Sequence, residues 1–338
     1  MRKRTKETTP FLPNFPLAQA GRRRLSELTK FKRNQDKLSR HNLKEFRQIF
    51  IEFLSPELFT SSDGQRNRIF TNELTFWAFL NQVLIGFSCA GVVKRVQNWL
   101  LKKKAPLPSS NTSAYCQAKK RLPTSLLKNI SRDIIDKSSR LIQQPELWWG
   151  KEVKVVDGTG LSMPDTKENQ EMYPQNKTLK AGCGFPQMSA VGLFSLTTGI
   201  MLDYKTGNKH DSEKTQWRSF WDQLNDDEIV LGDRGFCSYA NLAFLKLVKN
   251  VDSVMRFSRQ RKIDYSQCTK IGTNEWLSTW SKPRSRPKTW SKEQWEQIPE
   301  EFTVRLIKVK EYTPGFRSND IIIVTTLMDT NIYKIRED

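Results

Sequence analysis

The apolar pattern of the sequence changes its period near residue 148, and this change divides the chain. Across residues 41–147, apolar side chains recur at helical spacing, which predicts amphipathic helices. The first such series is Leu43, Phe46, Phe50 and Phe53. After residue 148, short runs rich in Val, Ile and Leu alternate with helical stretches, a pattern typical of an α/β domain. We therefore expect a helical domain over 41–147 and an α/β domain over 148–338.

The second part begins with three strands, followed by a helix, a strand, a second helix and a strand. This order is not that of a dinucleotide-binding repeat. Residues 258–303 interrupt it, because they are polar and rich in Lys, Arg and Pro. Two more strands follow, so we expect a β-rich insertion over about 258–328. The expected strands are 153–156, 188–196, 199–207, 229–231, 251–257, 304–312 and 321–327, and the expected helices are 212–224 and 239–248.

A large excess of positive charge restricts the partners that the chain can take. It has 56 Lys and Arg against 36 Asp and Glu, a formal net charge of +20. This favours a polyanionic partner, nucleic acid before an anionic membrane surface. Residues 1–40 hold 12 basic and 3 acidic residues. They form either a flexible arm on DNA phosphates or a solvated tail.

Several classes of protein are disfavoured by what the sequence lacks. No apolar run reaches about 18 residues, the length that a membrane span needs, and the N-terminus lacks the apolar core of a signal peptide. The five cysteines form no C-x-x-C pair, which disfavours a disulfide framework or a zinc site. No phosphate-binding loop of the G-x-x-x-x-G-K-[ST] type is present. A cytoplasmic protein is expected, and His210 is assigned to the start of a helix rather than to a metal.

A short basic helix is expected near residue 115. Ser, Asn and Thr residues that can cap a helix precede it, and Pro123 ends it. The helix carries Lys119, Lys120 and Arg121. These three side chains could enter a DNA groove, or they could form an ordinary solvated face.

Two aspartates follow two of the expected strands, Asp157 in VVDGTG and Asp233 in VLGDRGF. Strand ends are where α/β scaffolds place reacting groups. Two carboxylates brought together there repel each other, and a hard divalent cation such as Mg²⁺ relieves that repulsion. Two such ions about 3.5–4 Å apart can bind the attacking and leaving oxygens of a phosphoryl transfer. Either aspartate could instead be an ordinary turn or cap residue.

Aromatic and basic residues mix in the stretch 256–295. Either the tryptophans fill the core of the insertion, or at least one of them stacks on an exposed base, as in proteins that bind single strands. The four candidates are Trp276, Trp280, Trp290 and Trp295.

Several segments taken together resemble the DDE transposases of the insertion-sequence-four family in bacteria. The match covers about residues 60–338, and its most specific part is the pair DGTG and GDRGF with the strand VTTL. The segments are RNRIFTNELTFWAFLNQVL, SAYCQAKKRLP, VVDGTGLSMPDTKENQEMYPQ, GCGFPQMSAVGLFSLTTG, VLGDRGFCSY and GFRSNDIIIVTTLMD.

The resemblance implies a fold and an activity. It implies an RNase H-like, mixed-sheet catalytic domain with a β-rich insertion, preceded by a helical DNA-binding domain. It also implies Mg²⁺-dependent hydrolysis and strand transfer at transposon ends, with Mn²⁺ able to substitute. The partners implied are terminal-repeat and target DNA and a second subunit in a synaptic complex, with the protein at the nucleoid.

The resemblance also implies roles for individual residues. Asp157 and Asp233 match the first two acids of the DDE triad and would bind the metal. Arg234 follows the second acid, as it commonly does in such proteins, and we take it as a DNA contact. An insertion-domain tryptophan can hold a flipped base in relatives, and we take Trp290 for this role.

The chain departs from the family pattern at its third acid. In relatives the last strand leads into a helix with the pattern Y-x-x-R-x-x-x-E, and here Tyr333 and Arg336 match the Tyr and the Arg. Both are therefore candidate DNA contacts. The Glu would fall two residues beyond Asp338, so most of the C-terminal helix is expected to be missing. The hypothesis is a truncated transposase that is inactive alone. Its alternative role is that of a DNA-binding inhibitor of transposition.

Overall fold

The computed structural model describes residues 32–33, 36–59, 68–175, 180, 182–208, 211–258, 262–311 and 319–333. Most of the basic arm expected over 1–40 lies outside these residues, and so does His210. The chain divides after Arg140 into two compact units, close to the boundary expected between 147 and 148. In the part of the chain that the structure describes, no helix is long and apolar enough to cross a membrane.

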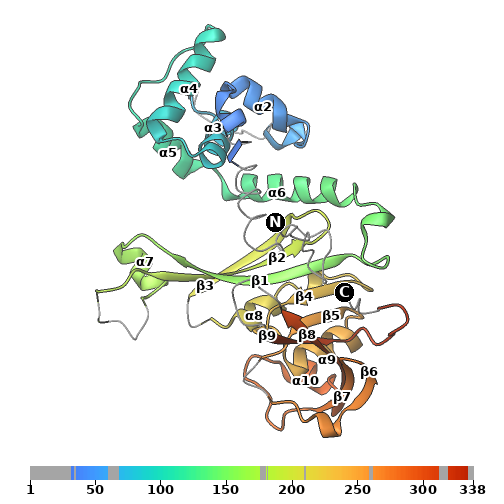
Figure 1. The fold of residues 1–338 in the computed structure, drawn as a ribbon. Helices are drawn as coiled ribbons and strands as arrows, with labels where there is room; N and C mark the ends of the chain where they lie inside the picture. The colour runs from blue at the N-terminus through green and yellow to red at the C-terminus, as the bar shows by residue number, and fades with distance from the viewer. Residues whose placement is uncertain are drawn as a thin grey trace, which may run out of the picture. The chain divides into compact units, whose positions relative to one another are not determined.

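The described residues of the first unit are helical (Figure 1). Several helices begin at residues whose side chains accept hydrogen bonds from free backbone amides of the first turn. Asn42 forms a capping box with Glu45, and Thr71 and Ser88 cap the next two helices. Trp77, 0% exposed, lies in the core between these helices. The elements are α2 (Leu43–Ile51), η2 (Pro56–Phe59), α3 (Asn72–Ile85), α4 (Cys89–Lys102), α5 (Ser113–Arg121) and α6 (Thr124–Ser139).

The second unit is built on one nine-stranded mixed sheet with the strand order β3-β2-β1-β4-β5-β9-β8-β7-β6 (Figure 1). The strands are β1 (Val153–Ser162), β2 (Gln187–Ser195), β3 (Met201–Asn208), β4 (Ile229–Gly232), β5 (Asp252–Arg256), β6 (Thr269–Gly272), β7 (Glu275–Ser281), β8 (Glu301–Glu311) and β9 (Asn319–Thr325). The helical segments are η3 (Gln144–Glu146), α7 (Lys167–Met172), α8 (Glu213–Arg218), η4 (Trp221–Gln223), α9 (Tyr239–Leu247), η5 (Tyr265–Gln267) and α10 (Lys292–Glu296).

The first five strands of the chain are neighbours in the sheet, in the order β3-β2-β1-β4-β5. β1, β2 and β3 form an antiparallel meander, and β4 and β5 then add to β1 in parallel. The connections between the parallel strands contain helices, as parallel pairing requires. The mixed α/β class expected from the sequence is therefore confirmed.

Two expectations about single elements are corrected. β1 does not end at residue 156, because it pairs with β2 from Lys154 as far as Ser162, which lies opposite Gln187. The helix expected over 212–224 is split into α8 and η4, and three large aromatic side chains of this stretch lie in the core: Trp217, Phe220 and Trp221. The residues expected to form the β-rich insertion continue the sheet, since β9 pairs with β5, and β8, β7 and β6 follow.

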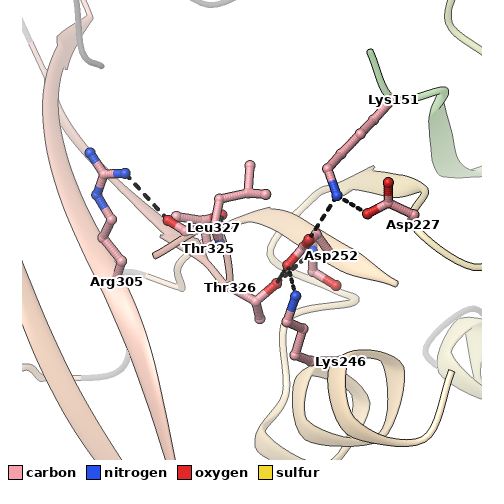
Figure 2. A network of polar contacts seen from close by, with 9 residues as sticks. Lys151, Asp227, Lys246, Asp252, Arg305, Thr325, Thr326 and Leu327 are labelled. Carbon is pink, nitrogen blue, oxygen red and sulfur yellow. Dashed lines mark hydrogen bonds and ion pairs between the residues drawn. The ribbon is translucent and has the colours of Figure 1, made fainter. Parts of the chain in front are cut away.

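A buried polar network joins the start of β5 to the end of β9 (Figure 2). The Asp252 carboxylate, 4% exposed, accepts a hydrogen bond from the Thr326 hydroxyl at 2.7 Å and pairs with Lys246 at 2.8 Å. Lys151 lies 3.7 Å from the same carboxylate and also pairs with Asp227. Because a buried charge is tolerated only when it is paired and hydrogen-bonded, this network fixes the last described segment against the sheet.

Candidate active site

The parallel pairing of β1 and β4 brings the two sequence-predicted aspartates together. Val156 of β1 and Gly232 of β4 are register partners. Asp157 directly follows Val156, and Asp233 directly follows Gly232. The backbones of the two aspartates are therefore neighbours across the two strands. Adjacent strands lie about 4.7–4.9 Å apart, which is close enough for two carboxylates to share one cation.

Both aspartates belong to the same face of the sheet. Val153, Ile229 and Leu231 pack in a small apolar cluster on that face. Because side chains alternate along a strand, Asp157 falls on the face of Val153, and Asp233 follows Leu231 at the same spacing. Asp157 is exposed, and the Asp233 side chain is 53% exposed. The pair is therefore open to solvent.

Each aspartate takes part in a local hydrogen bond with the backbone. The amide of Gly158 donates to Asp157 Oδ1 at 2.9 Å. The carbonyl of Asp233 accepts from the amide of Phe236 at 3.0 Å and closes the turn that leads to α9. Arg234 Nε lies 4.0 Å from Asp233 Oδ2, and the Arg234 side chain is 61% exposed. The Arg234 side chain therefore lies beside the second acid, and its guanidinium is exposed and accessible to a phosphate.

A third carboxylate lies close to the backbone of this site, and the sequence analysis missed it. A Cβ atom built on Gly158 would come 2.9 Å from Glu213 Oε1, and one built on Gly235 would come 3.8 Å from Glu213 Oε2. A side chain at position 158 would displace the end of the glutamate. Neighbouring residues of a strand face opposite sides of the sheet. Glu213, which lies against Gly158, is therefore on the face of β1 opposite to Asp157. Only tertiary packing brings it there, so no local motif could have found it.

The carboxylates of Asp157 and Asp233 suit a hard cation, but two side chains alone do not surround it. Two carboxylates supply the oxygen ligands that Mg²⁺ prefers, and an exposed site leaves room for water ligands. Within the described ranges, no group of three or more His, Cys, Asp and Glu residues could hold a metal. Asp157 and Asp233 thus fit Mg²⁺ as two protein ligands.

Trp290 lies in the core rather than on the surface. Its side chain is 3% exposed and contacts Trp221, Phe244 and Trp295, with ring centroids 5.7, 5.6 and 6.1 Å away. The Arg218 guanidinium lies 4.9 Å from the centre of its ring, and burial lowers the pKa of Arg218. Of the two alternatives for the tryptophans, a core position or stacking on a base, Trp290 thus occupies a core position. Its side chain also lines one wall of a cavity of about 320 Å³.

The other proposed DNA contacts are distributed over both units. In α5, Lys120 and Arg121 are exposed, whereas Lys119 turns inward and donates to Gln82 Oε1 at 3.1 Å. In the second unit, Tyr333 packs against the apolar cluster of Val153, Ile229 and Leu327 and lies edge-on to Trp149. Arg336 lies outside the described residues.

Arg305 holds the segment that carries Tyr333. Its side chain, 1% exposed, pairs with Glu275 and donates to the carbonyls of Leu327 at 3.3 Å and Tyr333 at 3.0 Å. Figure 2 shows the guanidinium aimed at the Leu327 carbonyl. The segment that follows β9 is therefore held by a buried cation, at the level where β5 begins.

This mixed sheet, with two aspartates at the same level of neighbouring parallel strands, is consistent with an RNase H-like domain. Residues 148–333 match the family described as the transposase DDE domain. The match covers more than half of the chain, and the chain belongs to this family. The family resemblance stated from the sequence is thereby confirmed.

Two relatives in Escherichia coli (strain K12) are similar over about 200 residues. One is the transposase InsG for insertion sequence element IS4, 24% identical over 198 residues, which are 58% of this chain and 43% of the relative. The other is the putative transposase InsZ, 24% identical over 198 residues, or 56% of this chain and 64% of the relative. The similarity therefore spans about half of these relatives, and it agrees with a transposase of the insertion-sequence-four type.

Proposed function

We propose that the chain is a DNA transposase that acts at the ends of an insertion sequence. Asp157 and Asp233 would hold Mg²⁺ at the phosphodiester that is cut and then joined to target DNA. The observation that carries this proposal is the register of β1 and β4, which sets the two acids side by side in a domain of the transposase family. The comparison with InsG, named as the transposase of an insertion sequence, supports the same activity.

The residues of the site have separable tasks in this reaction. Asp157 and Asp233 bind and orient the cation from two rigid strands. Bound Mg²⁺, or Mn²⁺ in its place, would supply charge stabilisation of the phosphoryl transfer. Arg234 is placed to pair with a phosphate beside the acids, because its guanidinium is exposed and only loosely paired with Asp233. Preorganised charges of this kind lower the barrier without reorganisation during the reaction.

DNA binding is the second part of the proposal. The net charge of +20 and the exposed Lys120 and Arg121 of α5 support contacts to phosphates. Such contacts release counterions, so the affinity must fall steeply as salt increases. We also propose a homodimer in a synaptic complex that holds two DNA ends, and a cytoplasmic protein that associates with the nucleoid through DNA.

A second candidate function is a binding protein that occupies transposon ends without cutting them. The observation that favours it is that the described residues bring two carboxylates to the site and not a group of three metal ligands. With two acids, fewer oxygens neutralise and place the metal charge, and transition-state stabilisation suffers. Such a chain would inhibit transposition by occupying the ends.

The test is a cleavage and binding assay on DNA that carries both ends of the encoding element, with Mg²⁺, Mn²⁺ or chelator. The transposase proposal predicts metal-dependent nicking that falls at least about a hundredfold in Asp157→Asn and Asp233→Asn. Asp226→Asn is the matched control, because Asp226 is exposed and lies on the loop before β4. End-specific binding without nicking would establish the inhibitor instead. Affinity that is independent of DNA sequence or insensitive to salt would contradict both.

A further inference from the structure

Two cysteines of the helical unit, Cys89 and Cys116, lie near polar side chains of neighbouring helices. Cys89 is the first residue of α4, directly after the N-cap Ser88. Gln82 Nε2 of α3 donates to Cys89 Sγ at 3.4 Å, and Lys119 Nζ of α5 lies 3.8 Å from the same sulfur. Cys116 lies three residues before Lys119 on the same face of α5, and its side chain is one of the groups that lower the pKa of Cys89. Three helices thus meet around one sulfur atom.

This environment favours the thiolate of Cys89. Positive ends of helices and neighbouring cations stabilise a thiolate and make a cysteine reactive. The pKa of Cys89 lies below its ordinary value, first because of the hydrogen bond from Gln82 and then because of Cys116 and Lys119, which together outweigh burial. The remaining titratable neighbour is Tyr115, whose pKa is raised by burial and by the two cysteines, so it stays a neutral hydrogen-bond donor to Gln82 at 2.7 Å.

The other three cysteines lie in different surroundings. Cys183 is exposed on a loop, Cys237 is buried, and Cys268 donates to the carbonyl of Asp264 at 3.3 Å. In the part of the chain that the structure describes, Cys89 is the cysteine that combines a helix start, a lysine and a second thiol. The cluster has no part in the proposed cleavage site, which lies in the other unit.

We propose that Cys89 and Cys116 form a thiol-exchange site that reacts with low-molecular-mass disulfides of the glutathione type. The Cys89 thiolate attacks one sulfur of glutathione disulfide, which breaks the S–S bond, forms a mixed disulfide and expels one glutathione thiolate. The Cys116 thiol then loses its proton and attacks the Cys89 sulfur, expelling the second glutathione. The two protein thiols are oxidised to one disulfide, the glutathione disulfide is reduced, and the two glutathione thiolates take up the protons.

Formation of this bond changes the surroundings of Lys119. The disulfide carries no charge, so the ammonium loses the thiolate that it faces in the reduced protein. The bond would also link the start of α4 to the middle of α5 covalently. Oxidation therefore acts on the helix that carries Lys120 and Arg121, without a change in either residue.

The experiment uses the full chain and compares its cysteines with one another. The reduced protein is alkylated with iodoacetamide from pH 6 to 10, quenched in acid, digested and quantified by mass spectrometry for each cysteine. We expect Cys89 to reach half of its maximal rate below about pH 8.5, the ordinary thiol value. In Lys119→Met the Cys89 midpoint should move up towards the ordinary value, and in the control Lys120→Met it should not move.

The second arm tests the exchange itself with glutathione disulfide as the probe. Wild-type protein should yield a peptide in which Cys89 and Cys116 are joined, and Cys116→Ser should accumulate glutathione on Cys89. A Cys89 midpoint at or above about pH 8.5 would overturn the proposal. So would a Cys116→Ser protein that carries glutathione mainly at another cysteine, or a wild-type protein without the joined peptide. Because the first arm needs no variant, a variant that fails to fold leaves the test intact.

Discussion

Lys154 and Glu228 form a buried ion pair, in which the lysine Nζ lies 2.8 Å from the glutamate Oε2 and the side chains are 6% and 5% exposed. The pair joins the start of β1 to the residue before β4, next to the two strands that carry the acids. Lys154 also donates to the carbonyl of Gln223 at 2.9 Å, and Asn225 donates to Glu228 through its backbone and its side chain. The charges are therefore paired and hydrogen-bonded.

Removing one partner of this pair is expected to destabilise the second unit strongly. Lys154→Met leaves the Glu228 carboxylate buried without a counter-ion, which costs about 3–5 kcal/mol of unfolding free energy. Urea unfolding followed by circular dichroism measures the loss. The control is Lys205→Met, because Lys205 pairs with Asp203 at 3.8 Å near the surface, and such pairs contribute about 0–1 kcal/mol. Equal effects in the two variants would contradict the buried role of Lys154.

Gly232 is required by close packing immediately before the second acid. A Cβ atom at this position would lie 2.6 Å from Met255 Sδ and 3.0 Å from Val156 Cγ1. Both neighbours are at most 1% exposed, so they cannot move aside freely. Gly232→Ala is expected to lower the unfolding free energy by about 1–3 kcal/mol, as overpacking does. The matched control is Gly160→Ala in β1, where nothing lies within 4 Å of the added atom, and a similar loss there would refute the packing argument.

The elements that could be predicted from the sequence are those that a short stretch of apolar residues defines by its own spacing. The apolar periods placed the cores of β2, β4, β5 and α9 within one or two residues of their observed bounds. The two aspartates were found because each follows a short apolar run, and the family motifs strengthened the choice. What the residues alone could not supply is the register of β1 and β4, which makes two separate aspartates one site.

Features that depend on contacts between distant segments escaped prediction. Glu213 comes close to the backbone of Gly158 only through tertiary packing, in which α8 contacts β2 and β3. The pairing of β9 with β5 joins residues about 70 positions apart, and this pairing makes the expected insertion part of the main sheet. The inward turn of Lys119 likewise depends on Gln82, which lies on another helix.

The stability of the helical unit is expected to depend on pH through Asp133. Its carboxylate accepts hydrogen bonds from the amide and the hydroxyl of Ser55, both at 2.7 Å, and from Lys137 at 3.0 Å. Burial alone raises the pKa of Asp133, but the bonds from Ser55 and Lys137 outweigh it, so the pKa lies below the ordinary 3.8. A lowered pKa in the folded state means that this stabilisation is complete above pH 3.8 and is lost as the pH falls through the folded value.

Asp133→Asn removes this charge and should therefore show a pH-dependent cost. At pH 7 it is expected to lower the unfolding free energy by about 1.5–3 kcal/mol, the contribution of hydrogen bonds to a charged group. The difference from wild type should shrink below pH 3.8, where the aspartate takes up a proton. Urea unfolding at pH 7, 5 and 3 measures it, with Asp136→Asn, an exposed position on the same helix, as control. A cost that stays constant with pH would show that the charge is not responsible.

The role of Trp290 can be decided by separating stability from DNA affinity. Its ring is 3% exposed and stacks among Trp221, Phe244 and Trp295, so Trp290→Ala should lower the unfolding free energy by about 3–5 kcal/mol. Trp149→Ala, at a site that is 46% exposed, should cost much less and serves as control. A side chain that mainly stacks on a base gives the opposite result, because DNA affinity falls while stability is kept. Thermal unfolding and DNA titration of the same two variants therefore distinguish a core residue from a base contact.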